Sequence, residues 1–358
     1  MEEFKILAIN PGSTSTKVAV YRNAKSVFLK TIRHNSEELM RYPRITDQFE
    51  FRKEIILKEL QEAEIDINKI SAVVGRGGLI KPIESGVYFV NDRMKQDLRD
   101  CIRGEHASNL GALIADDIAR SLPNAKAYIA DPVVVDELQD VARISGHPKF
   151  ERVSIFHALN QKAIARQYAK SLDRKYEELN LIVAHLGGGI SVGAHLKGRV
   201  VDVNNALDGE GPFSPERAGT VPAGQLAKLC FSGEVTCDEV KKMLTGQGGL
   251  VAHLGTNDAY EIEMKAKAGD KKAILIQDAM SYNIAKQIGQ MATVLKGEVD
   301  GIILTGGIAH NPYLVEYVKE MVGFIGHVVV YPGEDEMQAL AMNALMALRG
   351  DVLPRDYK

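Results

Sequence analysis

The chain has 358 residues, and a prior of about 100–200 residues per domain predicts two domains. Its 45% hydrophobic and 25% charged residues are typical of a globular protein with an ample core, and its formal charge of −3 excludes a general attraction to nucleic acid or to an acidic membrane surface. Three scattered cysteines exclude a cysteine-based zinc site, and the absence of a signal segment or a long apolar run predicts a soluble, cytoplasmic protein without a membrane partner.

The N-terminal segment predicts a β-hairpin with an unusually polar tip. Two apolar runs, 6–9 and 18–21, flank four consecutive hydroxyl residues that lie between Gly12 and Lys17, with Asn10 before them. Backbone N–H groups, hydroxyls and an ammonium suit an anionic tetrahedral group such as phosphate. A plain solvated Ser/Thr turn is the alternative. The segment is not a P-loop, because GxxxxGK[ST] is absent and a strand follows.

The rest of the first half predicts alternating strands and helices. We expect strands over 27–32, 70–74 and 127–130 and a helix over 46–64. Two further helices are expected, one with Asn91 as its N-cap that runs through Cys101 and one with Ser108 as its N-cap that runs through Leu122. The strand over 70–74 runs into Gly75-Arg76-Gly77-Gly78, where the glycines leave the guanidinium able to reach a carboxylate or a phosphate. The strand over 127–130 runs into Asp131, and the carboxyl end of a strand is where such sheets bind ligands.

The second half predicts a similar alternation. We expect helices over 157–172, 236–244, 270–295 and 337–348, and another that follows Asn311. We expect strands over 181–185, 190–195, 199–203, 301–304 and 327–331. Residues 204–221 form a long polar loop without periodicity, and loops of that length are usually functional or disordered.

One internal repeat links the two halves. The segment 181–196 has the plan of 6–21, an apolar strand, a tip of small residues and a returning strand, and a third glycine turn follows the buried strand over 301–304. Glycine tips let backbone N–H groups approach a phosphate closely. Two related hairpins that open two α/β halves predict a duplicated fold with a cleft between its lobes.

Four motifs carry a resemblance to a known family. They are ILAINPGSTSTK at 6–17, HLGGG at 185–189, PERAGTVPAG at 215–224 and LTGGIAHN at 304–311. On these motifs the chain resembles the acetate and butyrate kinase family, within the superfamily of actin-like proteins, sugar kinases and Hsp70 ATPases. It is more similar to the butyrate branch, since acetate kinases usually carry HLGNG and are usually longer.

The resemblance implies a reaction, a fold and an assembly. The reaction is ATP + short-chain carboxylate ⇌ ADP + acyl phosphate, with Mg²⁺ and with butanoate, or a branched acid such as isobutyrate, as substrate. The fold is α/β, with two duplicated RNase H-like lobes and a nucleotide cleft between them. The N-terminal lobe would comprise 1–132 plus 337–358 and the C-terminal, nucleotide-binding lobe 133–336, in a homo-oligomer of at least two chains.

The chemistry of this reaction favours cations over a catalytic base. A carboxylate is already ionised near neutral pH, so the obstacle is the approach of two anions, which arginines and hydrogen-bond donors relieve. The resemblance implies this role for Arg76 and Arg217, with a solvated surface charge as the alternative. It also implies that His185 stabilises the moving phosphoryl group and that His157 orients its neighbours, although a histidine that ends an apolar strand is often a core residue.

Metal and nucleotide ligands are implied in the same way. Mg²⁺ prefers one or two carboxylates, and its candidate ligands are Asp131, Glu336 and Asn10, of which Asp131 is also a catalytic candidate. Glu334, Asp335 and Glu336 are adjacent, so any of the three could serve the metal, and a solvated helix N-terminus is the alternative interpretation of these acids. Asn10, Ser13, Ser15 and Lys17 would hold phosphates. The nucleotide would further contact Gly187, Gly188, Gly189, Asp258, Gly306, Gly307 and Asn311. Acetate kinases carry an arginine two residues beyond that aspartate, where this chain has Tyr260.

Three alternatives stay open. Burial of a methylene contributes only about 0.8 kcal/mol, so an acetate or propionate kinase would look similar and neighbouring acids would all react. A non-catalytic ATP-binding protein of the same superfold would bind ATP without forming an acyl phosphate. A sugar kinase would need a carboxylate base beside its hydroxyl acceptor, for which Asp131 would be the candidate.

Overall fold

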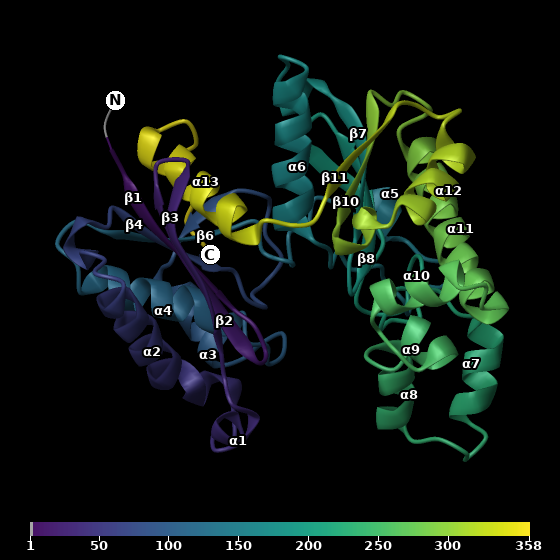
Figure 1. Ribbon diagram of the computed structural model, residues 1–358, viewed down its shortest axis with the longest axis horizontal. Coiled ribbons are helices and arrows are strands. Elements are labelled where there is room, and N and C mark those ends of the chain that lie inside the picture. Colours follow the sequence, from purple (N-terminus) through teal and green to yellow (C-terminus); the bar gives the residue numbers. More distant parts are fainter. Residues whose placement is uncertain (1–2) are drawn as a thin grey trace. The chain divides into compact units, whose positions relative to one another are not determined.

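The computed structural model describes residues 3–358, which divide into two compact units. The first unit comprises Met1–Val135 and Asp335–Lys358, and the second comprises Asp136–Glu334. Each unit is an α/β structure built around one sheet (Figure 1). None of the helices in the described part of the chain combines the length and hydrophobicity that a membrane span requires.

The sheet of the first unit begins with the predicted hairpin. Its strands are β1 (Lys5–Pro11), β2 (Ser15–Arg22), β3 (Lys25–Arg33), β4 (Ala72–Arg76), β5 (Val87–Phe89) and β6 (Lys126–Ala130), in the order β3-β2-β1-β4-β6-β5. β1, β2 and β3 are antiparallel, whereas β4 pairs parallel with both β1 and β6. Six of the seven residues of β1 are buried, which explains the nearly continuous apolar run in its sequence.

Helices cover both faces of this sheet (Figure 1). They are α2 (Phe49–Glu62), α3 (Asp92–Arg99) and α4 (Asn109–Arg120) on one side and α13 (Glu336–Arg349) on the other, and the short helix α1 (Ser36–Leu39) follows β3. The predicted cap of α3 is confirmed, because the Asn91 side chain accepts a hydrogen bond from the Met94 N–H at 3.0 Å. The predicted cap of α4 is wrong in detail: Ser108 has helical dihedral angles and its side chain caps no N–H.

The second sheet repeats the first. Its strands are β7 (Asn180–Leu186), β8 (Ile190–Leu196), β9 (Arg199–Val203), β10 (Gly301–Gly306) and β11 (Val328–Pro332), in the order β11-β10-β7-β8-β9. β7, β8 and β9 form an antiparallel meander, and β10 pairs parallel with β7 and β11. This is the arrangement of β1, β2, β3, β4 and β6, so the predicted duplication is confirmed.

Two helices of the second unit, α6 (Ala158–Ser171) and α11 (Lys271–Val294), pack on opposite faces of its sheet. Against α11 pack α9 (Gly249–Leu254), α10 (Ala259–Lys267) and α12 (Pro312–Val322). The other helices are α5 (Asp140–Arg143), α7 (Ala223–Cys230) and α8 (Cys237–Leu244). Ile182 and Ala184 of β7 pack in the core that contains α11 and α12, whereas Leu181 and Val183 pack in the core that contains α6. This alternation follows from the two-residue period of a strand.

Candidate active site

In the first unit, the hairpin presents its polar tip to solvent. The strands pair Asn10 with Lys17, and the Gly12 N–H donates to the Ser15 carbonyl at 2.7 Å, which closes a tight turn. Ser13 and Lys17 are exposed and Ser15 is half-buried. Three of the four residues predicted to hold phosphates therefore lie accessible at this turn.

A buried arginine that the sequence analysis missed lies beneath the tip. Arg52 of α2 is 0% exposed. Its Nη1 donates to the Gly12 carbonyl at 2.8 Å and the Ser15 carbonyl at 3.1 Å, and its Nη2 donates to the Ser13 carbonyl at 3.2 Å. Arg52 shares the buried face of α2 with Ile56 and Leu60, at four-residue intervals. This four-residue spacing is the feature of the sequence from which the burial of Arg52 could have been predicted.

His34 extends this network by one step. Arg52 Nη1 donates to the Thr16 hydroxyl at 3.1 Å, and that hydroxyl lies 2.8 Å from His34 Nε2. Burial, with a smaller contribution from the Arg52 charge, lowers the pKa of His34 to about 4. The imidazole is therefore neutral at physiological pH, which suits its place beside a guanidinium.

We expect His34 to make the protein acid-sensitive. The His34 imidazole takes up a proton near pH 6.5 in the unfolded chain and only near pH 4 in the folded chain. Its contribution to the free energy of unfolding is therefore complete above pH 6.5, and roughly 3 kcal/mol is lost as the pH falls to 4. Urea unfolding of the parent and of His34→Gln at pH 7 and 4.5 measures this. The parent should lose about 2 kcal/mol more than the variant, and equal losses would contradict the assignment.

A second cluster in the first unit joins three of the predicted residues. The Glu336 carboxylate accepts a hydrogen bond from Asn10 Nδ2 at 2.6 Å and lies 2.8 Å from Arg76 Nη1. Arg76 is the last residue of β4. Glu336 is the first residue of α13, whereas the sequence predicted that the helix begins one residue later, at 337. Its neighbour Asp335 caps the helix by accepting from the Gln338 N–H at 2.8 Å. The cluster thus offers a carboxylate, an amide and a guanidinium.

Asp131 has a different set of partners. It is 1% exposed, and its Oδ1 accepts hydrogen bonds from the Ser85 hydroxyl at 2.6 Å and the Gly86 N–H at 2.9 Å. Its φ of +39° is strained for an aspartate. These contacts favour a role in holding the chain around Ser85, and the metal or catalytic role of Asp131 stays a prediction.

In the second unit, two stacked histidines lie beside the glycine turn 187–189. The rings of His157 and His185 are 3.8 Å apart and inclined by 12°. His185 is 2% exposed, with Nδ1 2.8 Å from Asn160 Oδ1 and Nε2 3.4 Å from Glu334 Oε2. His157 Nδ1 lies 2.8 Å from the Ser191 hydroxyl. The stacking and these contacts fix the orientation of the His185 ring.

Arg217 packs against the same turn. A Cβ at Gly189 would lie 2.0 Å from Arg217 Nη1, so the glycine lets the guanidinium lie directly against the turn. Ser214, in the same loop, donates its hydroxyl to the Gly188 carbonyl at 2.7 Å. Within residues 3–358, the Ala206 carbonyl accepts the hydrogen bond of Arg217, and no carboxylate pairs with it. Desolvation lowers the pKa of Arg217, which nevertheless stays a cation at neutral pH.

A pocket of about 400 Å³ opens next to this turn, within the size range of small-molecule sites. Four predicted residues line it, namely Gly187, Gly188, Asp258 and Gly307. The sequence analysis missed its other lining residues, Pro215, Glu216, Asn257, Ala259 and Ile308. They belong to loops and short helices whose proximity is set by the tertiary fold. Asp258 also caps α10, because its Oδ1 accepts from the Tyr260 and Glu261 N–H groups.

Two further predicted residues have structural contacts. The Asn311 side chain accepts from the Tyr313 and Leu314 N–H groups and thereby caps α12, and its amide donates to Gln277 at 3.2 Å. Gly306 has φ +91°, and a Cβ there would lie 2.4 Å from the Leu186 carbonyl oxygen. Gly306 therefore permits the close approach of β10 to the end of β7. Nucleotide contacts of both residues stay predictions.

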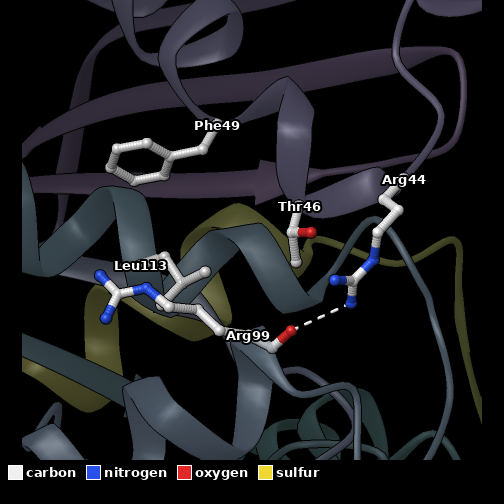
Figure 2. A pocket seen from close by; sticks show the side chains of 5 residues that line it. All are labelled: Arg44, Thr46, Phe49, Arg99 and Leu113. Carbon is white, nitrogen blue, oxygen red and sulfur yellow. Dashed lines mark hydrogen bonds between the residues drawn. The ribbon is translucent and has the colours of Figure 1, made fainter.

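A smaller hollow in the first unit contains none of the predicted residues. It measures about 260 Å³ and is lined by Arg44, Thr46, Phe49, Arg99 and Leu113 (Figure 2). Arg44 donates to Glu105 at 2.9 Å and to the Arg99 carbonyl at 3.1 Å. Figure 2 shows the two guanidinium groups at opposite ends of the hollow, so they do not form one clamp for an anion.

The donor set fits Mg²⁺ only together with phosphate oxygens. Residues 3–358 contain no group of three or more His, Cys, Asp or Glu side chains that could hold a metal ion. Mg²⁺ is satisfied by one or two carboxylates with phosphate and water oxygens, and Glu336 with Asn10 offers one carboxylate and one amide oxygen. The ion would then be held largely by its substrate.

Solved structures share this fold over almost the whole chain. An acetate kinase of Porphyromonas gingivalis has a TM-score of 0.79 at 20% identity, covering 96% of this chain and all of that chain. A propionate kinase from Francisella tularensis subsp. tularensis SCHU S4 has a TM-score of 0.75 at 20% identity, covering 95% and 98%. Acetate kinase from Entamoeba histolytica has a TM-score of 0.73 at 17% identity, covering 94% and 97%.

The duplicated sheets, with a glycine turn and an adjoining pocket of about 400 Å³ in the second unit, define an α/β protein of the actin-like ATPase fold. The family model described as the acetokinase family matches residues 151–338. The chain belongs to the acetokinase family. It is accordingly an ATP-binding phosphotransferase whose acceptor is a carboxylate.

Proposed function

We propose that this carboxylate kinase is a butyrate kinase, which catalyses ATP + butanoate ⇌ ADP + butanoyl phosphate by direct in-line transfer. The observation that supports phosphoryl transfer best is Arg217, a desolvated cation without a carboxylate partner in the described chain, packed on Gly189. Such a cation is stabilised by an anion, and the pocket beside the turn offers that anion a place. The preference for butanoate rests on HLGGG at 185–189, where acetate kinases usually carry HLGNG.

The second unit would hold the nucleotide. The pocket would receive the adenosine, with Asp258 near the ribose, and the N–H groups of the 187–189 turn would meet the phosphate chain. Arg217 and His185 lie against that turn, where a guanidinium and an imidazole would stabilise charge on the transferring phosphoryl group. No general base is required, because the acceptor carboxylate is ionised at neutral pH.

The first unit would hold the acceptor and the metal. Arg76 would pair with the carboxylate of the acid in place of Glu336, and the hairpin tip would hold phosphate oxygens. Asn10 and Glu336 are the residues that would hold Mg²⁺, which when bound supplies positive charge to the phosphate oxygens.

Trapping of acyl phosphate with hydroxylamine tests the proposal. With ATP and a series of C2 to C5 acids, we expect kcat/KM to be highest for butanoate and to fall about fourfold for each methylene removed. A maximum at acetate or propionate would identify an acetate or propionate kinase instead. ATP binding without any acyl hydroxamate would favour a non-catalytic ATP-binding protein, and phosphorylation of a sugar in parallel assays would favour a sugar kinase.

A further inference from the structure

Arg52 fixes the orientation of the peptide groups at the hairpin tip. Three tip carbonyls, those of Gly12, Ser13 and Ser15, accept hydrogen bonds from its guanidinium. Because the carbonyl and the following N–H of a trans peptide point in opposite directions, the N–H groups of Ser13 and Thr14 point away from Arg52. Neither N–H has an acceptor among residues 3–358, and both residues are exposed. Two outward N–H groups with adjacent hydroxyls are hydrogen-bond donors that an anion can use.

The guanidinium also carries a charge that the described chain does not neutralise. Its remaining acceptors are the Gln48 side chain, at 2.8 and 3.0 Å, and the Thr16 hydroxyl. All of these groups are uncharged, and no carboxylate pairs with Arg52 in residues 3–358. Burial lowers the pKa of Arg52 only to about 10, so the charge is present at neutral pH. A buried and unpaired cation is costly for the fold, and an anion nearby offsets that cost.

We propose that Arg52 is a positioning residue for a phosphate group at the hairpin tip, where it turns three carbonyls inward and places a positive charge beneath the anion. Arg52 itself is fully buried and does not touch the ligand. The assignment of that phosphate to ATP rests on the proposed function. Helix α2 thereby has a role in substrate binding. Its sequence does not indicate this role, because it has an ordinary amphipathic pattern.

Equilibrium binding of ATP and of adenosine to the full chain tests this role. In Arg52→Gln, which removes the charge, we expect ATP to bind at least tenfold more weakly and adenosine, which lacks phosphates, to bind within twofold of the parent. Arg52→Lys keeps the charge but cannot bridge the three carbonyls, so we expect an intermediate loss. Lys53→Gln is the matched control, since it removes the adjacent positive charge, which pairs at the surface with Glu50 and Asp117. It should leave both affinities unchanged.

Several outcomes would overturn the proposal. Unchanged ATP affinity in folded Arg52→Gln would do so, as would an equal loss for ATP and adenosine, which indicates general damage to the fold. Thermal unfolding followed by circular dichroism identifies a misfolded variant, and Arg52→Lys then decides by the same comparison of ATP with adenosine. The readout is separate from the proposed activity: a parent that binds ATP but forms no acyl phosphate refutes the butyrate kinase while leaving the Arg52 result interpretable.

Discussion

Substitution of Arg217 by alanine is expected to lower kcat by about 10²- to 10³-fold. The guanidinium lies against Gly189, with no carboxylate partner in residues 3–358, and its charge would stabilise the phosphoryl group as it leaves ADP. The pocket proposed for adenosine is lined by other residues, so the affinity for ATP should change by less than about threefold. Steady-state assays of acyl phosphate formation, together with equilibrium binding of ATP, measure the two quantities separately.

Two further variants sharpen the Arg217 experiment. Arg217→Lys should recover only a small part of the rate, because an ammonium cannot reproduce the planar fork of the guanidinium. Arg174→Ala is the matched control in the same unit: it removes an arginine that pairs with Asp300 at 3.2 Å at the surface. It should retain the parental kcat. An Arg217→Ala enzyme whose kcat stays within a few-fold of the parent would remove Arg217 from the mechanism.

The fold could be predicted from the sequence because its main signals are local. The apolar runs of β1 and β7, each followed by small residues and a returning strand, identified both hairpins and hence the duplication. The short helices α7, α9 and α10 were missed, since eight, six and nine residues give little periodicity, whereas α8, also of eight residues, begins at the strong N-cap Thr236 and was predicted. The edge strand β5, with three residues, was missed for the same reason.

The candidate site was predictable in part. The motifs identified Gly187, Gly188 and Gly307, and the family resemblance added Asp258; all four line one pocket in the structure. They could not show that Arg217 lies against Gly189, because the two residues are 28 positions apart in the chain and meet only in the fold. For Asn311 the sequence predicted only that a helix follows it; the structure shows that its side chain caps that helix, whereas its contact with a nucleotide rests on the family resemblance alone.

Arg76→Ala is expected to act chiefly on the carboxylate substrate. A bidentate guanidinium–carboxylate contact contributes several kcal/mol when it is desolvated, so kcat/KM for butanoate should fall by about 10²- to 10³-fold. In the structure Arg76 pairs with Glu336, with both side chains partly buried, at 26% and 14% exposure. The KM for ATP should change by less than about threefold, because the pocket proposed for adenosine lies in the second unit.

The variant Glu336→Gln distinguishes two roles of Arg76, binding of the substrate carboxylate and positioning of the Glu336 carboxylate. If Arg76 served only to hold that carboxylate, Glu336→Gln and the double variant would reproduce the loss seen in Arg76→Ala. We expect instead that Arg76→Ala raises the KM for butanoate, whereas Glu336→Gln raises the Mg²⁺ concentration needed for half-maximal rate, as befits a metal ligand. Arg120→Ala, which removes a surface pair with Asp116 at 2.9 Å in the same unit, should change neither quantity. Equal KM values for butanoate in Arg76→Ala and the parent would assign the acceptor carboxylate to another cation.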